Sequence, residues 1–98
     1  MAKWTRQPQE QEGTYFFSGN FYATTPVVAQ LPPEELAAIY NDLQAFVREK
    51  GGIDYLQVYL DEQGRKLYLI DQLNREMIES GQYQPDDNHH TLLWAHEY

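Results

Sequence analysis

Asp54-Tyr-Leu-Gln-Val-Tyr-Leu60 and the following segment, Lys66-Leu-Tyr-Leu-Ile-Asp71, indicate the architecture of this chain more clearly than any other part of the sequence. Large side chains alternate in both segments with a period of two, which is the spacing of half-buried β-strands. Asp61-Glu62-Gln63-Gly64 lies between them and is typical of a tight turn, because glycine adopts positive φ at no steric cost. The two segments therefore predict a β-hairpin.

The alternation also predicts which face of this hairpin is buried. Tyr55, Gln57 and Tyr59 share one face of the first strand, and Leu56, Val58 and Leu60 share the other. We expect the aliphatic face to meet a helix and the tyrosine face to be partly exposed. A third alternating segment, Thr91-Leu-Leu-Trp-Ala-His-Glu-Tyr98, predicts a last strand over 91–95.

Residues 33–50 predict the main helix. Pro32 and Pro33 suit a first helical turn, and acidic side chains follow at Glu34 and Glu35, near the positive end of the helix dipole. Gly51 and Gly52 then provide the stop. Apolar residues recur at helical spacing in one stripe, formed by Leu36, Ile39, Tyr40, Leu43, Phe46 and Val47.

The segments before this helix are less regular. Residues 1–13 are polar and predict a flexible N-terminal tail, in which Trp4 is expected to fold back on the domain. Residues 13–24 are rich in aromatics around Ser18-Gly19-Asn20, and predict one strand with a bulge at Gly19 or a very short hairpin. Residues 25–31 lead into the helix.

After the hairpin, residues 72–81 predict one or two helical turns ending at Gly81, and residues 82–88 predict a loop. Together these elements predict a single α+β domain over 14–98. Its architecture is a small antiparallel sheet of about four strands with one main helix packed on one face.

Charge limits the classes of partner. The net charge is −8: residues 1–50 hold four basic and six acidic side chains, and residues 51–98 hold three and nine. This balance argues against direct nucleic-acid binding and against anionic membranes, since both need a basic patch. It permits attraction to a basic protein surface. The absence of cysteine and of an apolar leader or spanning segment predicts a cytoplasmic protein without disulfides.

Catalytic and cofactor motifs give little support to an enzyme. Neither Ser18 nor Ser80 lies in a nucleophile elbow, and Gly51-Gly52 ends a helix instead of cradling a phosphate. We therefore expect no cofactor and no catalytic residues. The alternative is a small metal-binding protein or enzyme that uses His89, His90 and His96 with Asp86 or Asp87, which would need a curled loop to converge on one ion.

The chain also resembles a known family. FYATTPVV (21–28), LPPEELAAIYNDL (31–43), DYLQVY (54–59), LYLID (67–71) and the terminal TLLWAHEY (91–98) are similar to the uncharacterised bacterial family called domain of unknown function 960. The resemblance covers about residues 21–98. It implies a small α+β fold, no established activity and a phage or plasmid context.

The leading hypothesis is a small acidic protein-interaction module, such as a phage- or plasmid-encoded accessory or inhibitor protein that binds a basic protein partner. We expect Tyr55, Tyr59 and Tyr68 to make aromatic contacts. Four acidic residues would steer the partner: Asp61, Glu62, Asp86 and Asp87. A homodimeric structural protein, whose tyrosine face is the dimer seam, is a further alternative.

Overall fold

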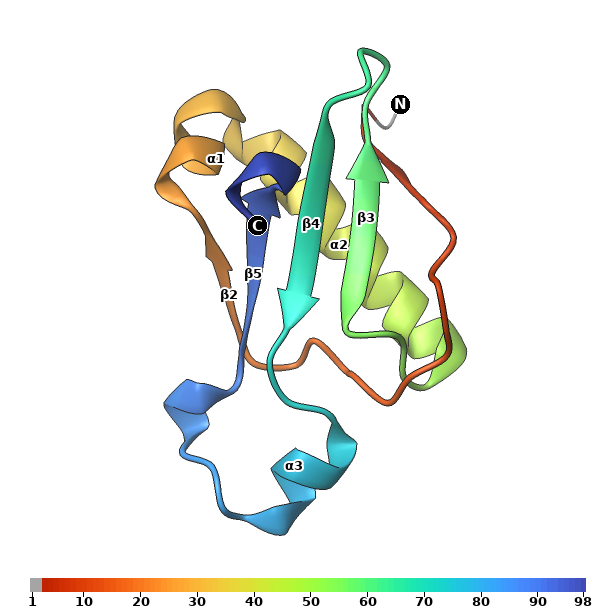
Figure 1. The fold of residues 1–98 in the computed structure, drawn as a ribbon, viewed down its shortest axis with the longest axis vertical. Helices are drawn as coiled ribbons and strands as arrows, with labels where there is room; N and C mark the ends of the chain where they lie inside the picture. Colours follow the sequence, from red (N-terminus) through yellow and green to blue (C-terminus); the bar gives the residue numbers. More distant parts are fainter. Residues whose placement is uncertain (1–2) are drawn as a thin grey trace.

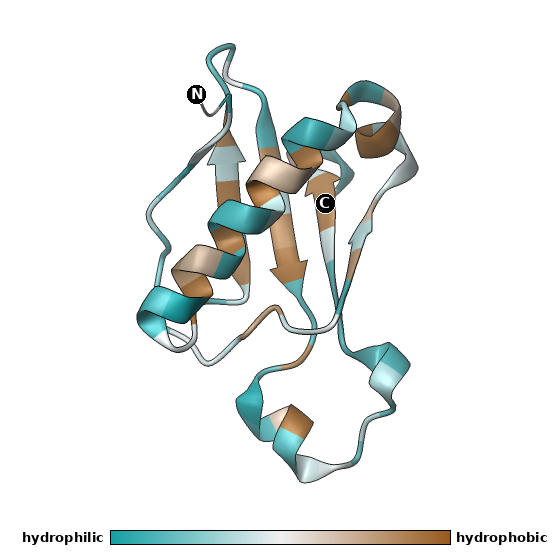
Figure 2. Cartoon of the chain, turned by 180° about the vertical axis from the view of Figure 1, so that it is seen from behind, coloured by the Kyte–Doolittle hydropathy of each residue, from teal (hydrophilic) through white to brown (hydrophobic). Residues whose placement is uncertain are grey.

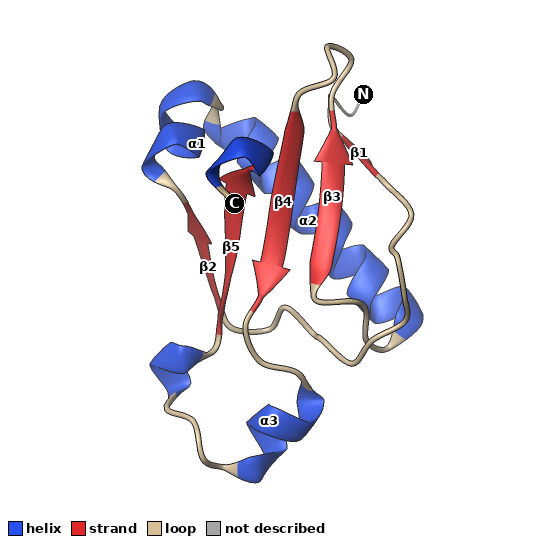
Figure 3. Cartoon of the chain, viewed as in Figure 1, coloured by secondary structure: helices blue, strands red, loops and turns tan. Residues whose placement is uncertain are grey.

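In the computed structural model, which describes residues 3–98, a five-stranded sheet carries its main helix on one face (Figures 1 and 3). The strand order is β1-β3-β4-β5-β2. In chain order the elements are β1 (Thr5–Arg6), β2 (Asn20–Ala23), α1 (Thr25–Gln30), α2 (Pro33–Lys50), β3 (Leu56–Leu60), β4 (Lys66–Asp71), α3 (Arg75–Ser80), the short 3-10 turn η1 (Pro85–Asp87), β5 (His89–Trp94) and the 3-10 turn η2 (Ala95–Glu97).

The predicted hairpin is confirmed as β3 and β4. The strands are antiparallel, with Val58 opposite Tyr68, and β5 extends the sheet in the same antiparallel sense, with Leu93 opposite Tyr68. Gly64 in the connecting turn has φ 82°, the left-handed conformation that favours glycine. The centre of the sheet therefore follows the alternation in the sequence.

The sheet is mixed, which corrects the prediction of an antiparallel sheet of about four strands. β2 pairs with β5 in parallel, with Asn20 opposite His89 and Ala23 opposite Leu92. Residues 13–24 form neither a hairpin nor a strand bulged at Gly19. Gly19 instead lets two backbones meet, since a Cβ atom there would lie 2.0 Å from the carbonyl oxygen of Asn88.

The N-terminal segment is ordered along the sheet, which corrects the prediction of a flexible tail over 1–13. Thr5 and Arg6 form β1 opposite Leu60 and Tyr59, and Trp4 is buried, so the aromatic does fold back as expected. Residues 1–2 of the predicted tail lie outside the described residues. Burial of the large Trp4 ring supplies the apolar contact that holds this polar segment in place.

Helix α2 begins and ends where the sequence predicted. Its first turn carries Glu34 and Glu35, and its last turn is followed by Gly51 in the left-handed conformation, with φ 74°. Figure 2 shows the helix lying across one face of the sheet. The short helix α1, which precedes it, was not predicted, because its Thr-Pro-Val-Val-Ala-Gln sequence is too short to show a helical period.

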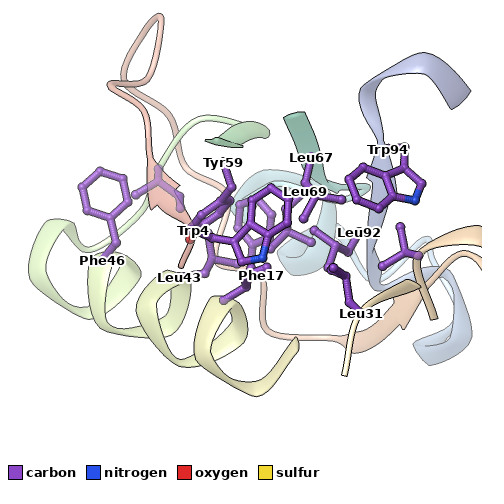
Figure 4. Packing of buried hydrophobic residues seen from close by; sticks show 13 residues of the cluster. Trp4, Phe17, Leu31, Leu43, Phe46, Tyr59, Leu67, Leu69, Leu92 and Trp94 are labelled. Carbon is purple, nitrogen blue, oxygen red and sulfur yellow. The ribbon is translucent and has the colours of Figure 1, made fainter. Parts of the chain in front are cut away.

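The core lies between α2 and the sheet. Phe46 lies at one end of this core and Trp94 near the other (Figure 4). Between them the buried aromatic and aliphatic side chains come from nearly every element, including Trp4, Phe17, Ile39, Leu43, Ile53, Leu67, Leu69 and Leu92. Phe17 has a φ of 49°, and its amide donates a 2.8 Å hydrogen bond to the buried carboxylate of Asp71.

The faces of β3 are opposite to those expected. Gln57 and Tyr59 are buried on the helix side, whereas Leu56, Val58 and Leu60 are half-buried. Tyr59 is only 1% exposed, and its hydroxyl donates a 2.8 Å hydrogen bond to Asp42 of α2. The Gln57 amide nitrogen donates to Gln9 and to the carbonyl of Asp54. The face with Gln57 and Tyr59 can be buried, although it is the less apolar of the two, because both polar side chains donate hydrogen bonds.

Candidate functional site

One face of the sheet carries no α-helix among residues 3–98, and only the short turn η2 lies on it, near the end of β5. It is the face seen in Figure 1, with α2 behind it. Strand register places half-buried apolar side chains along three adjacent strands on this side: Leu56, Val58 and Leu60 from β3, Tyr68 and Ile70 from β4, and Leu93 from β5. An apolar sheet face of this extent is a feature of interaction surfaces.

Tyrosine side chains lie over and around this face. Tyr98, which is 71% exposed, packs on Tyr68 with ring centroids 5.5 Å apart and an edge-to-face angle of 84°. Tyr55 lies just before β3 and is half-buried, and the charge of the Tyr98 phenol raises the pKa of the Tyr55 phenol above its ordinary value. We call the following set the tyrosine surface: Tyr22, Tyr55, Tyr68, Tyr83 and Tyr98.

The remaining two tyrosines extend this surface toward β2 and toward the loop after β4. Tyr22 lies opposite Thr91 in the register and packs against His89 at 5.3 Å. Tyr83 lines a shallow hollow with His89 and Met77. Tyr22 and Tyr83 are 49% and 44% exposed. Tyrosine is enriched at protein interfaces because its ring is rigid, largely apolar and able to hydrogen-bond.

The hollow adjoins the ends of β4 and β5. Its lining includes Gln72 and His89, whose backbones are joined by a 3.2 Å hydrogen bond at the end of β4 and β5. Residues 72–88, which carry α3 and η1, form a lobe that extends beyond the sheet (Figure 1). Two neighbouring antiparallel strands need only a two-residue connection, so a lobe of this length is a feature that function commonly explains.

The predicted contact residues divide between two environments. Tyr55 and Tyr68 belong to the tyrosine surface, whereas Tyr59 is buried beneath α2 and has no place on that surface. Burial and the adjacent Asp42 carboxylate raise the pKa of the Tyr59 phenol well above its ordinary value. Tyr59 is therefore a core residue, and its prediction as a contact residue was wrong.

The predicted steering acids lie at opposite ends of the sheet. Glu62 is exposed in the β3–β4 turn, and Asp86 and Asp87 are exposed in η1 within the lobe. Asp61 has a different role, because its buried carboxylate accepts a 2.7 Å bond from the guanidinium of Arg65 and holds the turn backbone. Burial raises the pKa of Asp61, but the hydrogen bonds and charge of Arg65 outweigh it and lower the pKa overall.

The three histidines do not converge. His90 is buried on the helix side of β5, with its ring 5.4 Å from Phe21 and 6.0 Å from Tyr40. His89 belongs to the opposite side, and His96 lies beyond the strand against Trp94. Across residues 3–98 there is no group of three His, Cys, Asp or Glu side chains placed to hold a metal ion. The geometry gives the metal alternative no site.

Burial explains the state of His90. It lowers the pKa of the imidazole to about 4, with a smaller contribution from the charge of His89, so the ring is neutral near pH 7. Neither ring nitrogen has a hydrogen-bond partner among the described residues. Burial likewise raises the pKa of Asp71, which lies opposite His90 in the sheet. Both groups belong to the core and not to a solvent-facing site.

Three members of the tyrosine surface were not predicted from the sequence. Tyr22 alternates with Phe21 in the FYAT segment, which could have placed it on an open face. Tyr83 and Tyr98 lie outside regular strands, so no period could have indicated where they point. Their positions depend on the path of the lobe and of η2.

Comparison with protein-family models, with curated proteins and with solved structures gives no match. Across residues 3–98, none of the helices has both the length and the apolar character needed to cross a membrane.

Proposed function

We propose that this protein is a protein-interaction module and not an enzyme, and that it docks a basic protein partner on the tyrosine surface. The observation that carries the proposal is the gathering of exposed tyrosines on and beside the sheet face that no α-helix of residues 3–98 covers. Three of the five large hydrophobic side chains that are most exposed belong to this surface: Tyr22, Tyr83 and Tyr98.

Charge supports a basic partner. The chain carries a net charge of −8, and acidic side chains lie at both ends of the sheet face, at Glu62 and at Asp86 and Asp87. A partner with an apolar centre and basic flanks would bury its centre on the sheet. Its flanks would gain in association rate from the acidic ends. A cytoplasmic accessory or inhibitor protein of a phage or plasmid, as the family resemblance implies, is the biological setting we propose.

The experiment is affinity capture from a lysate of the source organism, eluted with a salt gradient and identified by mass spectrometry. Substitution Tyr68→Ser together with Tyr98→Ser should abolish capture of the specific partner. Val28→Ser is the matched control, because Val28 is 56% exposed on α1, outside the tyrosine surface, and its loss should leave capture intact.

Charge reversal tests the second half of the proposal. Glu62→Lys, Asp86→Lys and Asp87→Lys together should lower the salt concentration at which the partner elutes. Glu49→Lys, near the end of α2 and outside the proposed surface, is the control for reversing the charge of a single acidic residue, and it should leave the elution of the partner nearly unchanged. The proposal is wrong if the triple variant retains the same partner with the same salt dependence.

The same surface also admits a second candidate, the homodimeric structural protein. A second copy would cover the half-buried aliphatic side chains equally well, although two chains of net charge −8 repel each other. Sedimentation at two concentrations separates the candidates. A dimer that Tyr68→Glu dissociates would favour the structural role, and a monomer at both concentrations would exclude it.

A further inference from the structure

A groove lies between the residues just before β1 and the first half of α2, on the side of the sheet opposite to the tyrosine surface. Its volume is about 280 Å³. Trp4, Ile39 and Tyr59 form a floor of buried side chains, and the rim is charged. Three carboxylates of α2 contribute to that rim: Glu34, Glu35 and Asp42.

The floor holds two of these carboxylates in place. The indole nitrogen of Trp4 donates a 2.9 Å hydrogen bond to Glu35 Oε1, and the hydroxyl of Tyr59 donates one of 2.8 Å to Asp42 Oδ2. Because both donors belong to buried rings, the acceptors lie at fixed positions above an apolar surface. Such a groove fits a side chain that is apolar along its length and positively charged at its end.

A lysine of the chain itself already uses this site. Lys3 lines the groove, and its Nζ atom is 3.8 Å from Glu35 Oε2, although half of the side chain remains exposed. Water reaches the Lys3 side of this pair, and ion pairs open to water stabilise a protein by only about 0–1 kcal/mol, so an incoming cation can replace Lys3. Asp42 is paired with another cation of the chain, because Arg6 Nε lies 3.0 Å from Asp42 Oδ2.

We propose that the groove receives a lysine side chain of the protein partner. The methylene stem would lie on Trp4 and Ile39, and the ammonium group would replace that of Lys3 at Glu35, with Glu34 on the same rim. Charge complementarity favours this occupant, because the groove has more carboxylates than cations on its rim. The inference rests on the proposed function in taking the partner to be basic, but it uses none of the tyrosine surface.

The experiment uses the full chain labelled with ¹⁵N and titrated with Nα-acetyl-lysine amide. The chain has two tryptophans, so the indole N–H signal of Trp4 reports directly on the groove, and that of Trp94 provides a comparison. We expect a saturable shift of the Trp4 signal and a smaller shift for Trp94. The neutral Nα,Nε-diacetyl-lysine amide, and sodium chloride at equal ionic strength, should give no saturable shift.

Two substitutions sharpen the test. Lys3→Gln removes the internal competitor and should tighten binding of the probe by about threefold or more, and Glu34→Gln should weaken it by a similar factor. Glu49→Gln, at the far end of the same helix, should change nothing. Both Lys3 and Glu34 are exposed, so the fold should survive their replacement.

The inference is overturned if the diacetylated probe or sodium chloride shifts the Trp4 signal as strongly as the charged probe does, or if Lys3→Gln leaves the affinity unchanged. Its failure can be told apart from failure of the proposed function. Tyr68→Ser together with Tyr98→Ser should abolish capture of the partner without altering the Trp4 titration, because Tyr68 lies on the other side of the sheet.

Discussion

His90 is the residue whose environment has the clearest consequence for stability. Its ring is stacked among Phe21, Tyr40 and Phe17 without a hydrogen-bond partner among the described residues. The unfolded chain binds a proton at His90 near pH 6.5, whereas the folded chain binds one only near pH 4. The contribution of His90 to stability is therefore fully present above pH 6.5 and is lost as the pH falls to about 4.

We predict that His90→Phe removes this part of the pH dependence. Urea unfolding of both proteins between pH 7 and pH 4 should show the wild type losing up to about 3 kcal/mol more than the variant. Asp71, whose pKa is raised by burial, contributes in the opposite direction in both proteins. His96→Gln at an exposed position is the control. Parallel pH profiles for wild type and His90→Phe would contradict the prediction.

Tyr59 provides a second prediction at this scale. Tyr59→Phe keeps the buried ring and removes the hydroxyl that donates to Asp42, so it should lower the free energy of unfolding by about 1–2 kcal/mol. Tyr68→Phe on the tyrosine surface should lower it by less than about 0.5 kcal/mol. Equal effects in chemical denaturation would show that the two tyrosines have similar environments, contrary to the structure.

At the scale of elements, the pairing of β2 with β5 depends on Gly19. A methyl group at Gly19 would lie 2.0 Å from the carbonyl oxygen of Asn88. This oxygen belongs to the backbone, so it cannot move aside as a flexible side chain could. At Gly64 a methyl group would meet nothing within 4 Å, so its φ of 82° is the main source of strain. Glycine is therefore required at position 19 because there is no space for a side chain, and at position 64 because of the backbone conformation.

We predict that Gly64→Ala lowers the free energy of unfolding by about 1 kcal/mol, the usual effect of an unfavourable φ. Gly19→Ala should lower it by more than about 2 kcal/mol and should also remove the protection of β2 amides from hydrogen exchange. If the amides of Phe21 and Tyr22 keep their protection in Gly19→Ala, β2 does not require the close approach.

The elements that could be predicted from the sequence are those with local signals. Helix α2 has a continuous apolar stripe and Gly51 at its end, and the β3–β4 hairpin has alternation and a glycine turn. The buried face of β3 could not be predicted, because Gln57 and Tyr59 are satisfied by Gln9 and Asp42, which are distant in sequence. The parallel pairing of β2 likewise joins segments that no local pattern connects.

The candidate site was predictable only in part for the same reason. Tyr68 lies in a regular strand, so its alternation with Leu67 and Leu69 places it on the open face. Tyr98 reaches that face through η2, and Tyr83 lines the hollow beside it through the lobe, and both paths depend on tertiary contacts. Asp61 stands in a polar turn segment that predicts exposed side chains, yet its carboxylate is buried in the turn and paired with Arg65.

For the molecule as a whole, the net charge of −8 should weaken the fold at low ionic strength. The described residues contain few ion pairs to offset it, and three of the four involve exposed or half-exposed side chains on both partners. At 0.1 M salt, the repulsion between surface charges that lie more than about 10 Å apart is largely screened. The unfolding temperature should therefore depend on sodium chloride.

We predict that about 0.5 M sodium chloride raises the unfolding temperature by roughly 5 °C, equivalent to about 1 kcal/mol. The variant with Glu62→Gln, Asp86→Asn and Asp87→Asn should show a smaller rise, because less repulsion remains to be screened. Scanning calorimetry measures both. A lower unfolding temperature in salt would mean that attractive pairs, and not net repulsion, dominate the surface.

The arrangement of the two edge strands has a consequence for the order of folding. β1 and β2 come from the start of the chain but pair with β3 and with β5, so that Asn20 lies opposite His89. Helix α2 and the β3–β4 hairpin close short loops and can form early, whereas β2 must wait until β5 has left the ribosome. During synthesis Phe17 and Phe21 therefore stay without their native neighbour His90, and the sheet is completed by the slowest, longest-range closure in the molecule.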